Sequence, residues 1–176
     1  MAKNKKDDIL QAACDLFFEN GYDNTSMKMI AKKAGVVQSH TYLFFETKEV
    51  LLTEVIHYAL SENYAVINEL LKNSMELSPE EFTDKCFEAF ATMREKATFI
   101  MHCALTPKLS GKVKEILQEY NTGLAPMLEP IFAGQEPEKI KIAAYLLTSL
   151  SDSYFLDNDE ETARSAFREV LRIYKK

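Results

Sequence analysis

The stretch ILQAACDLFFENGYDNTSMKMIAKKAGVVQSHTYLFFETKEVLL, residues 9 to 52, divides into apolar periodic segments separated by two glycines. Its apolar residues recur at intervals of three and four, which places them on one face of an α-helix. Gly21 and Gly35 mark the ends of two segments, because glycine is favoured after a helix and in tight turns. The stretch therefore predicts a helix over 6–20, a short helix capped by Thr25 or Ser26, and a third over 38–44.

The rest of the chain carries the same periodicity. It has few glycines and prolines, and no segment alternates apolar and polar residues as a strand would. An all-α protein is therefore predicted, in which capping and proline signals place the later helices. These signals are Thr47 before a helix running towards residue 73, a capping box at Ser78 and Glu81, a kinked or broken stretch around Gly123, Pro126 and Pro130, a start at Pro137, and a capping box at Asn158 and Glu161.

The composition limits the possible classes of protein. Of 176 residues, 47% are apolar and 27% charged, as in a folded globular protein. No apolar run is long enough to span a membrane, and the N-terminal lysines are not followed by the apolar core of a signal peptide. We therefore expect a cytoplasmic protein without a membrane partner. The three cysteines are widely spaced in apolar segments, so we expect buried thiols and no metal site. The sequence contains no nucleophile motif, so we expect neither an enzyme nor a cofactor.

The charge is unevenly distributed. A net charge of −6 disfavours a nucleic-acid partner, because lysine and arginine supply most of the affinity for phosphates. Residues 24–48, however, contain four lysines against one glutamate. The surplus of acid lies elsewhere, so a local basic surface near the N-terminus is expected.

Two short helices joined by a glycine turn, after a longer helix, form a helix-turn-helix arrangement, in which the second short helix enters the major groove of DNA. The stretch resembles the N-terminal DNA-binding domain of the TetR/AcrR family of transcriptional regulators. The family pattern is Phe-x-x-x-Gly-Tyr, Thr-Ser/Thr, Ile-Ala-x-x-Ala-Gly-Val, Tyr-x-x-Phe and Lys-x-x-Leu. It is matched here by Phe18, Gly21, Tyr22, Thr25, Ser26, Ile30, Ala31, Ala34, Gly35, Val36, Tyr42, Phe45, Lys48 and Leu51.

The resemblance implies a homodimeric repressor that binds a palindromic DNA operator and responds to a small-molecule effector. Residues 1–46 would form the helix-turn-helix domain, and residues 47–176 a helical ligand-binding and dimerisation domain. At matching positions, Ser26, Lys28, Tyr42 and Lys48 would contact phosphates, and Gln38, Ser39 and His40 would face base edges. The family usually has Ser-Lys-Gly-Thr where this chain has VVQSH, which removes the favoured helix cap and a lysine.

The aromatic residues at the end of the stretch divide between two interpretations. Phe45 is expected in the core with Leu16, Phe17 and Ile30, whereas Tyr42 is expected to face DNA. The assignment of Phe44 stays open between the two.

The remaining helices carry candidates for a ligand cavity and for a dimer interface. The cavity candidates, each equally explained by core packing, are Cys86, Phe90, Met93, Phe99, His102, Cys103, Tyr120 and Tyr145. Residues 142–150 are apolar almost all round, and the last helix has a clean apolar stripe, which favours a four-helix bundle between two copies. The interface candidates are Ala143, Leu147, Leu150, Tyr154, Ala163, Phe167, Val170, Leu171 and Tyr174.

A second function stays open on the same residues. The acidic balance and the unusual VVQSH segment would also suit a TetR-like module that binds a ligand or a protein and has little affinity for DNA.

Overall fold

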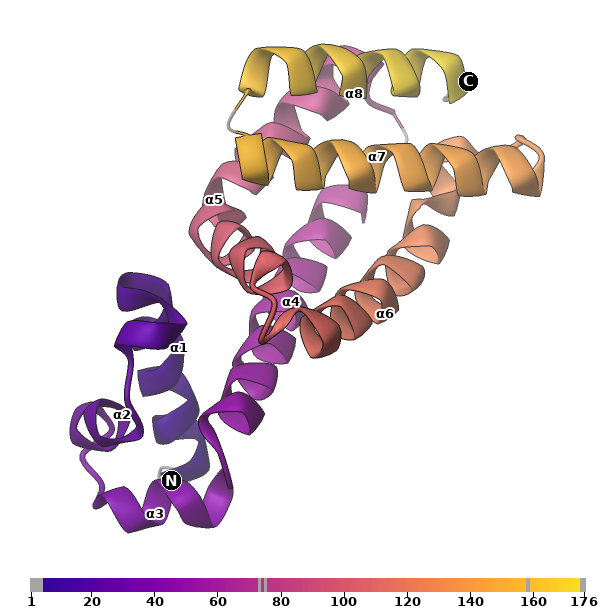
Figure 1. Ribbon diagram of the computed structural model, residues 1–176. Coiled ribbons are helices and arrows are strands. Elements are labelled where there is room, and N and C mark those ends of the chain that lie inside the picture. Colours follow the sequence, from indigo (N-terminus) through magenta and orange to yellow (C-terminus); the bar gives the residue numbers. More distant parts are fainter. Residues whose placement is uncertain (1–4, 73, 75, 158, 175–176) are drawn as a thin grey trace.

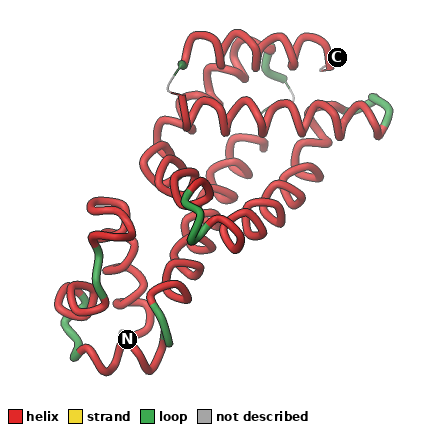
Figure 2. Tube along the Cα trace, viewed as in Figure 1, coloured by secondary structure: helices red, strands yellow, loops and turns green. Residues whose placement is uncertain are grey.

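The computed structural model describes residues 5–72, 74, 76–157 and 159–174, which form helices joined by short loops, with no strand among them (Figures 1 and 2). The all-α prediction is confirmed. None of the helices described is both long and apolar enough to cross a membrane. In chain order the elements are α1 (Lys5–Asn24), α2 (Met27–Lys33), α3 (Gln38–Phe44), α4 (Lys48–Lys72), α5 (Pro79–Leu105), α6 (Ser110–Leu128), the 3-10 helix η1 (Glu129–Phe132), α7 (Pro137–Asp157) and α8 (Glu160–Tyr174).

Helices α1, α2 and α3 form one end of the molecule, and α7 and α8 lie side by side at the other (Figure 1). Gly21 has φ 78° and ψ 168°, which interrupts α1 where the sequence predicted its end. The Thr25 hydroxyl closes this end by donating to the carbonyls of Leu16 and Gly21. Gly35, at φ 68°, makes the turn between α2 and α3, a conformation that side chains with a Cβ rarely adopt.

The first hydrophobic core joins the three N-terminal helices to the body. Phe45 is 1% exposed and packs with Phe17 and Ile30, as predicted. The same core continues into α4, α5 and α6, where the ring of Phe99 stacks on Phe17 at 6.2 Å and meets Phe18 edge-on at 5.3 Å. The hydrophobic core therefore crosses the boundary expected near residue 46.

The second core fills the space between α5, α7 and α8. Phe87 lies at its centre, with ring contacts to Phe90, Tyr154 and Phe167 at 5.3, 5.1 and 5.8 Å. This corrects the predicted dimer interface, because α8 packs on α5 as well as on α7 and the apolar stripes are covered within one chain. The predicted interface residues that are buried here are Ala143, Leu147, Tyr154, Ala163, Phe167, Val170 and Leu171, with Leu150 and Tyr174 partly buried beside them.

The proline and capping signals have different outcomes. The stretch predicted to be kinked or broken contains the end of α6, which continues through Pro126 to Leu128 and is followed by the 3-10 helix η1. Pro126 and Thr122, whose carbonyl the proline cannot bond, are both exposed, so water can reach that carbonyl. Asn158, the predicted cap of the last helix, lies outside the described residues, and Asp159 instead accepts from the backbone N–H of Thr162 at 3.1 Å. The capping box of Ser78 and Glu81 is present as predicted.

Candidate DNA-binding surface and ligand cavity

Helix α3 is held from one side and open on the other. Its buried Thr41 donates a hydrogen bond to the carbonyl of Gln38 at 2.7 Å, and Phe45 anchors its end in the core. Gln38, Ser39 and Tyr42 are exposed on the outer side. His40 is half-buried, and Phe44 is 42% exposed, so Phe44 belongs to the surface rather than the core. The seven residues of α3 thus present a small polar and aromatic face to solvent.

The start of α3 lacks a capping side chain. Its N-cap residue is Val37, with φ −74° and ψ 145°, and no side chain accepts a hydrogen bond from the first turn. By contrast, α2 is capped by Ser26, whose hydroxyl oxygen accepts from the N–H of Met29 at 3.2 Å. Replacing a capping serine or threonine with an aliphatic residue costs a helix about 0.5–2 kcal/mol. The short helix α3 therefore depends on its packing for stability.

One lysine of the predicted basic surface has acidic partners within the chain. Lys33 pairs with Asp15 of α1 at 3.0 Å and lies 3.9 Å from Glu19. Lys28 and Lys32 are exposed on α2. The local positive charge available to a phosphate is smaller than the sequence count suggested.

Lys48, predicted to contact phosphate, binds its own chain. Its ammonium donates to the carbonyl of Tyr22 at 2.8 Å and to that of Thr25 at 2.9 Å, and it lies 4.0 Å from the centre of the Tyr22 ring. An ammonium group has three N–H donors, so one is left for a phosphate. The phosphate contact stays a prediction, and the structure adds a role in joining the start of α4 to the link between α1 and α2.

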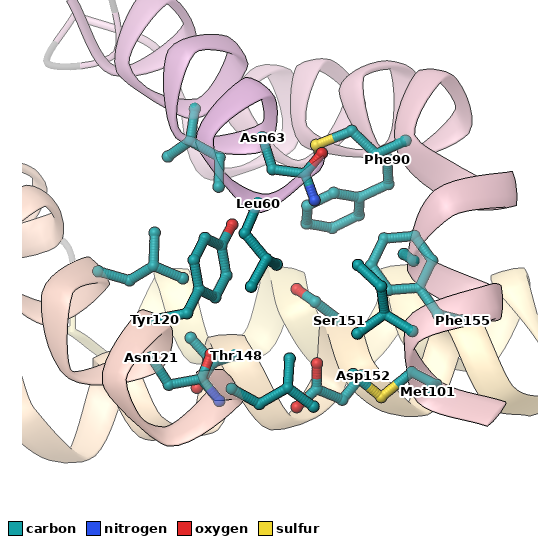
Figure 3. Close-up of a pocket in the computed structure, with 16 residues that line it drawn as sticks. Leu60, Asn63, Phe90, Met101, Tyr120, Asn121, Thr148, Ser151, Asp152 and Phe155 are labelled. Atoms are coloured by element: carbon teal, nitrogen blue, oxygen red, sulfur yellow. The ribbon is translucent and has the colours of Figure 1, made fainter. Parts of the chain in front are cut away.

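The body contains a cavity of about 70 Å³ bounded by α4, α5, α6 and α7 (Figure 3). Its walls are largely apolar and include Leu60, Phe90, Met93 and Phe155. A neighbouring cavity of about 60 Å³ shares Ile67, Phe90, Leu124, Thr148 and Ser151 with it. Of the predicted residues, Phe90, Met93 and Tyr120 line the first cavity, and Cys86 and Phe90 line the second.

Polar side chains from α4, α6 and α7 line the first cavity. Figure 3 shows Thr148, Ser151 and Asp152 on α7, across the space from Leu60 and Asn63 of α4. The Thr148 and Ser151 hydroxyls donate to carbonyls of their own helix, at 3.0 and 2.9 Å. Asp152 is half-buried, and this burial raises the pKa of its carboxyl to about 6. No ion pair or hydrogen bond joins this carboxylate to another of the described residues.

Four residues predicted for the cavity lie elsewhere. Phe99 and Cys103 belong to the first core, because the last turns of α5 face α1. His102 is exposed on the other side of that helix, and Tyr145 is 71% exposed beside a groove between α6 and α7. The 27-residue helix α5 passes both cores, and from Phe90 to Met101 one side of it lines the cavity, whereas Phe99 and Cys103 lie on another side of the same turns.

The cysteine predictions can be compared with the structure directly. All three are buried, as expected, and burial raises the pKa of Cys14 to about 12 and of Cys103 to about 11. The thiols of Cys14 and Cys103 are therefore unreactive at neutral pH. Among the described residues, no group of three histidine, cysteine or acidic side chains could hold a metal ion.

The helix-turn-helix unit also matches a known family in sequence. Residues 9–55 match the sequence model described as bacterial regulatory proteins, tetR family. In this part the chain is similar to the DNA-binding region of TetR-family regulators, as the sequence analysis expected.

Curated relatives are similar to only part of the chain. The uncharacterised HTH-type transcriptional regulator YhgD of Bacillus subtilis is 35% identical over 75 residues, which are 43% of this chain and 39% of that protein. The chain matches only 22% to 40% of the length of its curated relatives. Sequence similarity to these relatives is therefore partial.

Solved structures extend the likeness to the whole fold. A transcriptional regulator from Aquifex aeolicus VF5 is 24% identical, with a TM-score of 0.67 over 97% of this chain and 99% of that chain. The multidrug binding protein EbrR, solved with imidazole, is 18% identical, with a TM-score of 0.70 over 95% of this chain and 94% of that chain. The fold of these two structures thus extends over the body of this chain as well as its helix-turn-helix unit.

Sequence reasoning missed the polar residues of the cavity. Asn63, Asn121, Thr148, Ser151 and Asp152 all line it and were not predicted. One signal was present, because Asp152 is the single charged residue between positions 142 and 156. A lone carboxylate within an apolar helix marks a place where burial and charge conflict.

Proposed function

We propose that the chain is a ligand-responsive transcriptional repressor, which binds a palindromic operator as a homodimer and leaves it when a small molecule fills the cavity. The observation that carries this proposal is the face of α3, where Gln38, Ser39 and Tyr42 point away from a core that fixes the opposite side. A short helix held in this way can enter a major groove without unfolding its support.

The proposed contacts to DNA are of two kinds, those to phosphates and those to base edges. Ser26, Lys28 and Tyr42 contact phosphates, which fixes the register of the protein on the duplex. Gln38 reads adenine through paired hydrogen bonds, while Ser39 and His40 contact neighbouring base edges.

The homodimer forms through the outer faces of α7 and α8. Large apolar side chains of these two helices remain exposed, with exposed fractions of 43% for Ile142, 41% for Leu156 and 68% for Ile173. Two such helices from each copy would make a four-helix bundle, an arrangement that covers these side chains and sets the spacing of the α3 helices.

Helix α4 couples the cavity to the DNA-binding unit. Leu60 and Asn63 of α4 line the cavity, and Lys48 at its other end holds the carbonyls of Tyr22 and Thr25. A ligand that favours one position of α4 therefore favours one position of α3. By linkage, DNA and ligand weaken each other's binding by the same factor.

The test is selection of bound sequences from a random duplex library at about 50–100 mM salt, where phosphate contacts hold. We expect a palindrome whose half-sites lie about one helical turn apart. The matched controls are Gln38→Ala, which should lose preference at one position of each half-site, and Glu115→Ala, an exposed residue on α6 that should change nothing. A folded dimer that enriches no sequence would contradict the proposal.

The alternative function is a TetR-like binding module with little affinity for DNA. The uncapped start of α3 and the internal pairing of Lys33 favour it. The same selection separates the two functions, since a module of this kind would bind mixed DNA fragments weakly and without sequence preference.

A further inference from the structure

The cavity and an open groove on the surface are adjacent at Asp152. Leu117, Asn121, Thr148 and Asp152 line both the cavity and the open groove between α6 and α7. A molecule entering by this route passes the carboxylate before it reaches the apolar walls behind it. Asp152 thus lies at the mouth of the cavity.

The carboxylate at this mouth has no compensating charge. Lys114 and Lys141 line the same groove, yet burial is the cause of its shifted pKa and no lysine opposes it. From α6, Tyr120 faces the site as a neutral phenol, because burial raises its pKa. From α4 and α5 the lining contributes the neutral Asn63 and Met101. A buried carboxylate without a partner is costly, and an incoming cation would remove that cost.

The walls beyond Asp152 suit a single ring. Phe90, Tyr120 and Phe155 offer aromatic surface, and Met93 offers a polarisable thioether. The first cavity of about 70 Å³ is smaller than the engineered protein cavity of about 150 Å³ that admits benzene, so a ring bound there would also occupy the neighbouring cavity of about 60 Å³, with which it shares lining residues. Aromatic rings near a charged group also favour cations over anions.

We propose that the effector is a small organic monocation, an arylalkylammonium ion of one ring, whose ammonium pairs with Asp152 and whose ring lies between Phe90, Tyr120 and Phe155. This proposal rests on the proposed function, since it names the class of ligand for the same cavity. The ammonium donates to the carboxylate, and the amide oxygen of Asn121 can accept a further N–H.

The experiment compares three probes of one shape and three charges: phenethylammonium, phenethyl alcohol and phenylacetate. Binding to the full-length protein is measured by titration calorimetry without DNA, at neutral pH. We expect phenethylammonium to bind about tenfold more tightly than the alcohol or better, as a charge-assisted hydrogen bond to a buried carboxylate provides. Phenylacetate should bind more weakly than the alcohol, because two carboxylates would meet.

The variant Asp152→Asn keeps the size of the side chain and removes its charge. It should lower phenethylammonium binding to the level of the alcohol and leave alcohol binding unchanged. The matched control is Asp157→Asn, which removes an exposed carboxylate from the same helix and should preserve the preference. A thermal melt of each variant confirms that it is folded.

The inference is overturned if the protein binds the three probes with equal affinity, or if it does not bind phenethylammonium. It is also overturned if the Asp152→Asn variant still prefers phenethylammonium over phenethyl alcohol. Operator binding is then measured separately with and without phenethylammonium. Selective ammonium binding with no effect on an operator complex would uphold the ligand class and reject its role as effector. A protein that binds no operator but prefers the ammonium would reject the repressor function alone.

Discussion

The helix-turn-helix unit and the body obtain their helices from similar patterns but use them differently. In the unit, short helices depend on particular residues at particular places, such as Gly21 and Gly35 at positive φ and Thr25 closing α1. In the body, long helices bury broad apolar faces, where many aliphatic and aromatic residues would serve equally. The turns of the helix-turn-helix unit can therefore be recognised from particular residues in the sequence. The packing of the body is visible in the sequence only as the helical spacing of apolar residues.

The largest expected effect tests the core of the unit. Phe45→Ala should lower the free energy of unfolding by about 3–5 kcal/mol, because it empties a site that is 1% exposed and anchors α3. Operator binding should be lost with it. Chemical denaturation measures the change.

The control is its neighbour. Phe44→Ala, at a 42% exposed position, should change stability by no more than about 0.5 kcal/mol. Similar losses for both variants would show that Phe44 also supports the fold.

The second prediction concerns the body and its pH dependence. The pKa of Asp152 is about 6 when folded, against an ordinary value of 3.8. Between about pH 4 and 6 the folded chain keeps a proton that the unfolded chain has lost, so stability falls as pH rises. Asp152→Asn should remove this fall and raise stability above pH 6 by up to about 3 kcal/mol. Urea unfolding at several pH values measures it, and parallel curves for variant and wild type would contradict it.

The third prediction separates structural from DNA-binding lysines. Lys48→Met keeps the aliphatic stem but loses two hydrogen bonds to carbonyls, so stability should fall by about 1.5–3 kcal/mol. Thermal unfolding monitored by circular dichroism measures this.

Lys28→Met is the matched variant on an exposed site. Its stability should be unchanged, while the slope of log affinity for DNA against log salt should fall by about one. An unchanged slope would remove Lys28 from the phosphate contacts.

The smallest expected effect restores a cap. Val37→Ser places a hydroxyl at an N-cap that already has extended backbone, so stability should rise by about 0.5–1 kcal/mol. Hydrogen exchange of the α3 amides should slow at the same time. Exchange that is unchanged would indicate that another group already satisfies the first turn.

Sequence analysis predicted the unit more fully than the body. The bounds of α2 and α3, the interruption at Gly21 and the burial of Phe45 all agree with the structure. These follow from local signals, since a cap, a glycine turn and an apolar face are set by residues close in sequence.

The failures share one physical cause. Periodicity shows that Leu147 and Phe167 lie on apolar faces, but it does not show that α5 of the same chain covers them. Likewise Phe90 and Phe99 both lie on α5, yet one lines the cavity and the other packs on α1. Which helix covers an apolar face depends on the path of the chain in space. The same holds for Lys48, because the carbonyls that it binds belong to residues more than twenty positions earlier in the sequence.

The stacking of Phe99 on Phe17 has a practical consequence for chimeric regulators. An exchange of DNA-binding heads between two such proteins, cut near residue 46, would bring α1 of one against α5 of the other. In such a chimera, aromatic residues of α1 and α5 that come from different proteins would not pack together. DNA-binding units of this fold can therefore be exchanged only together with the end of α5.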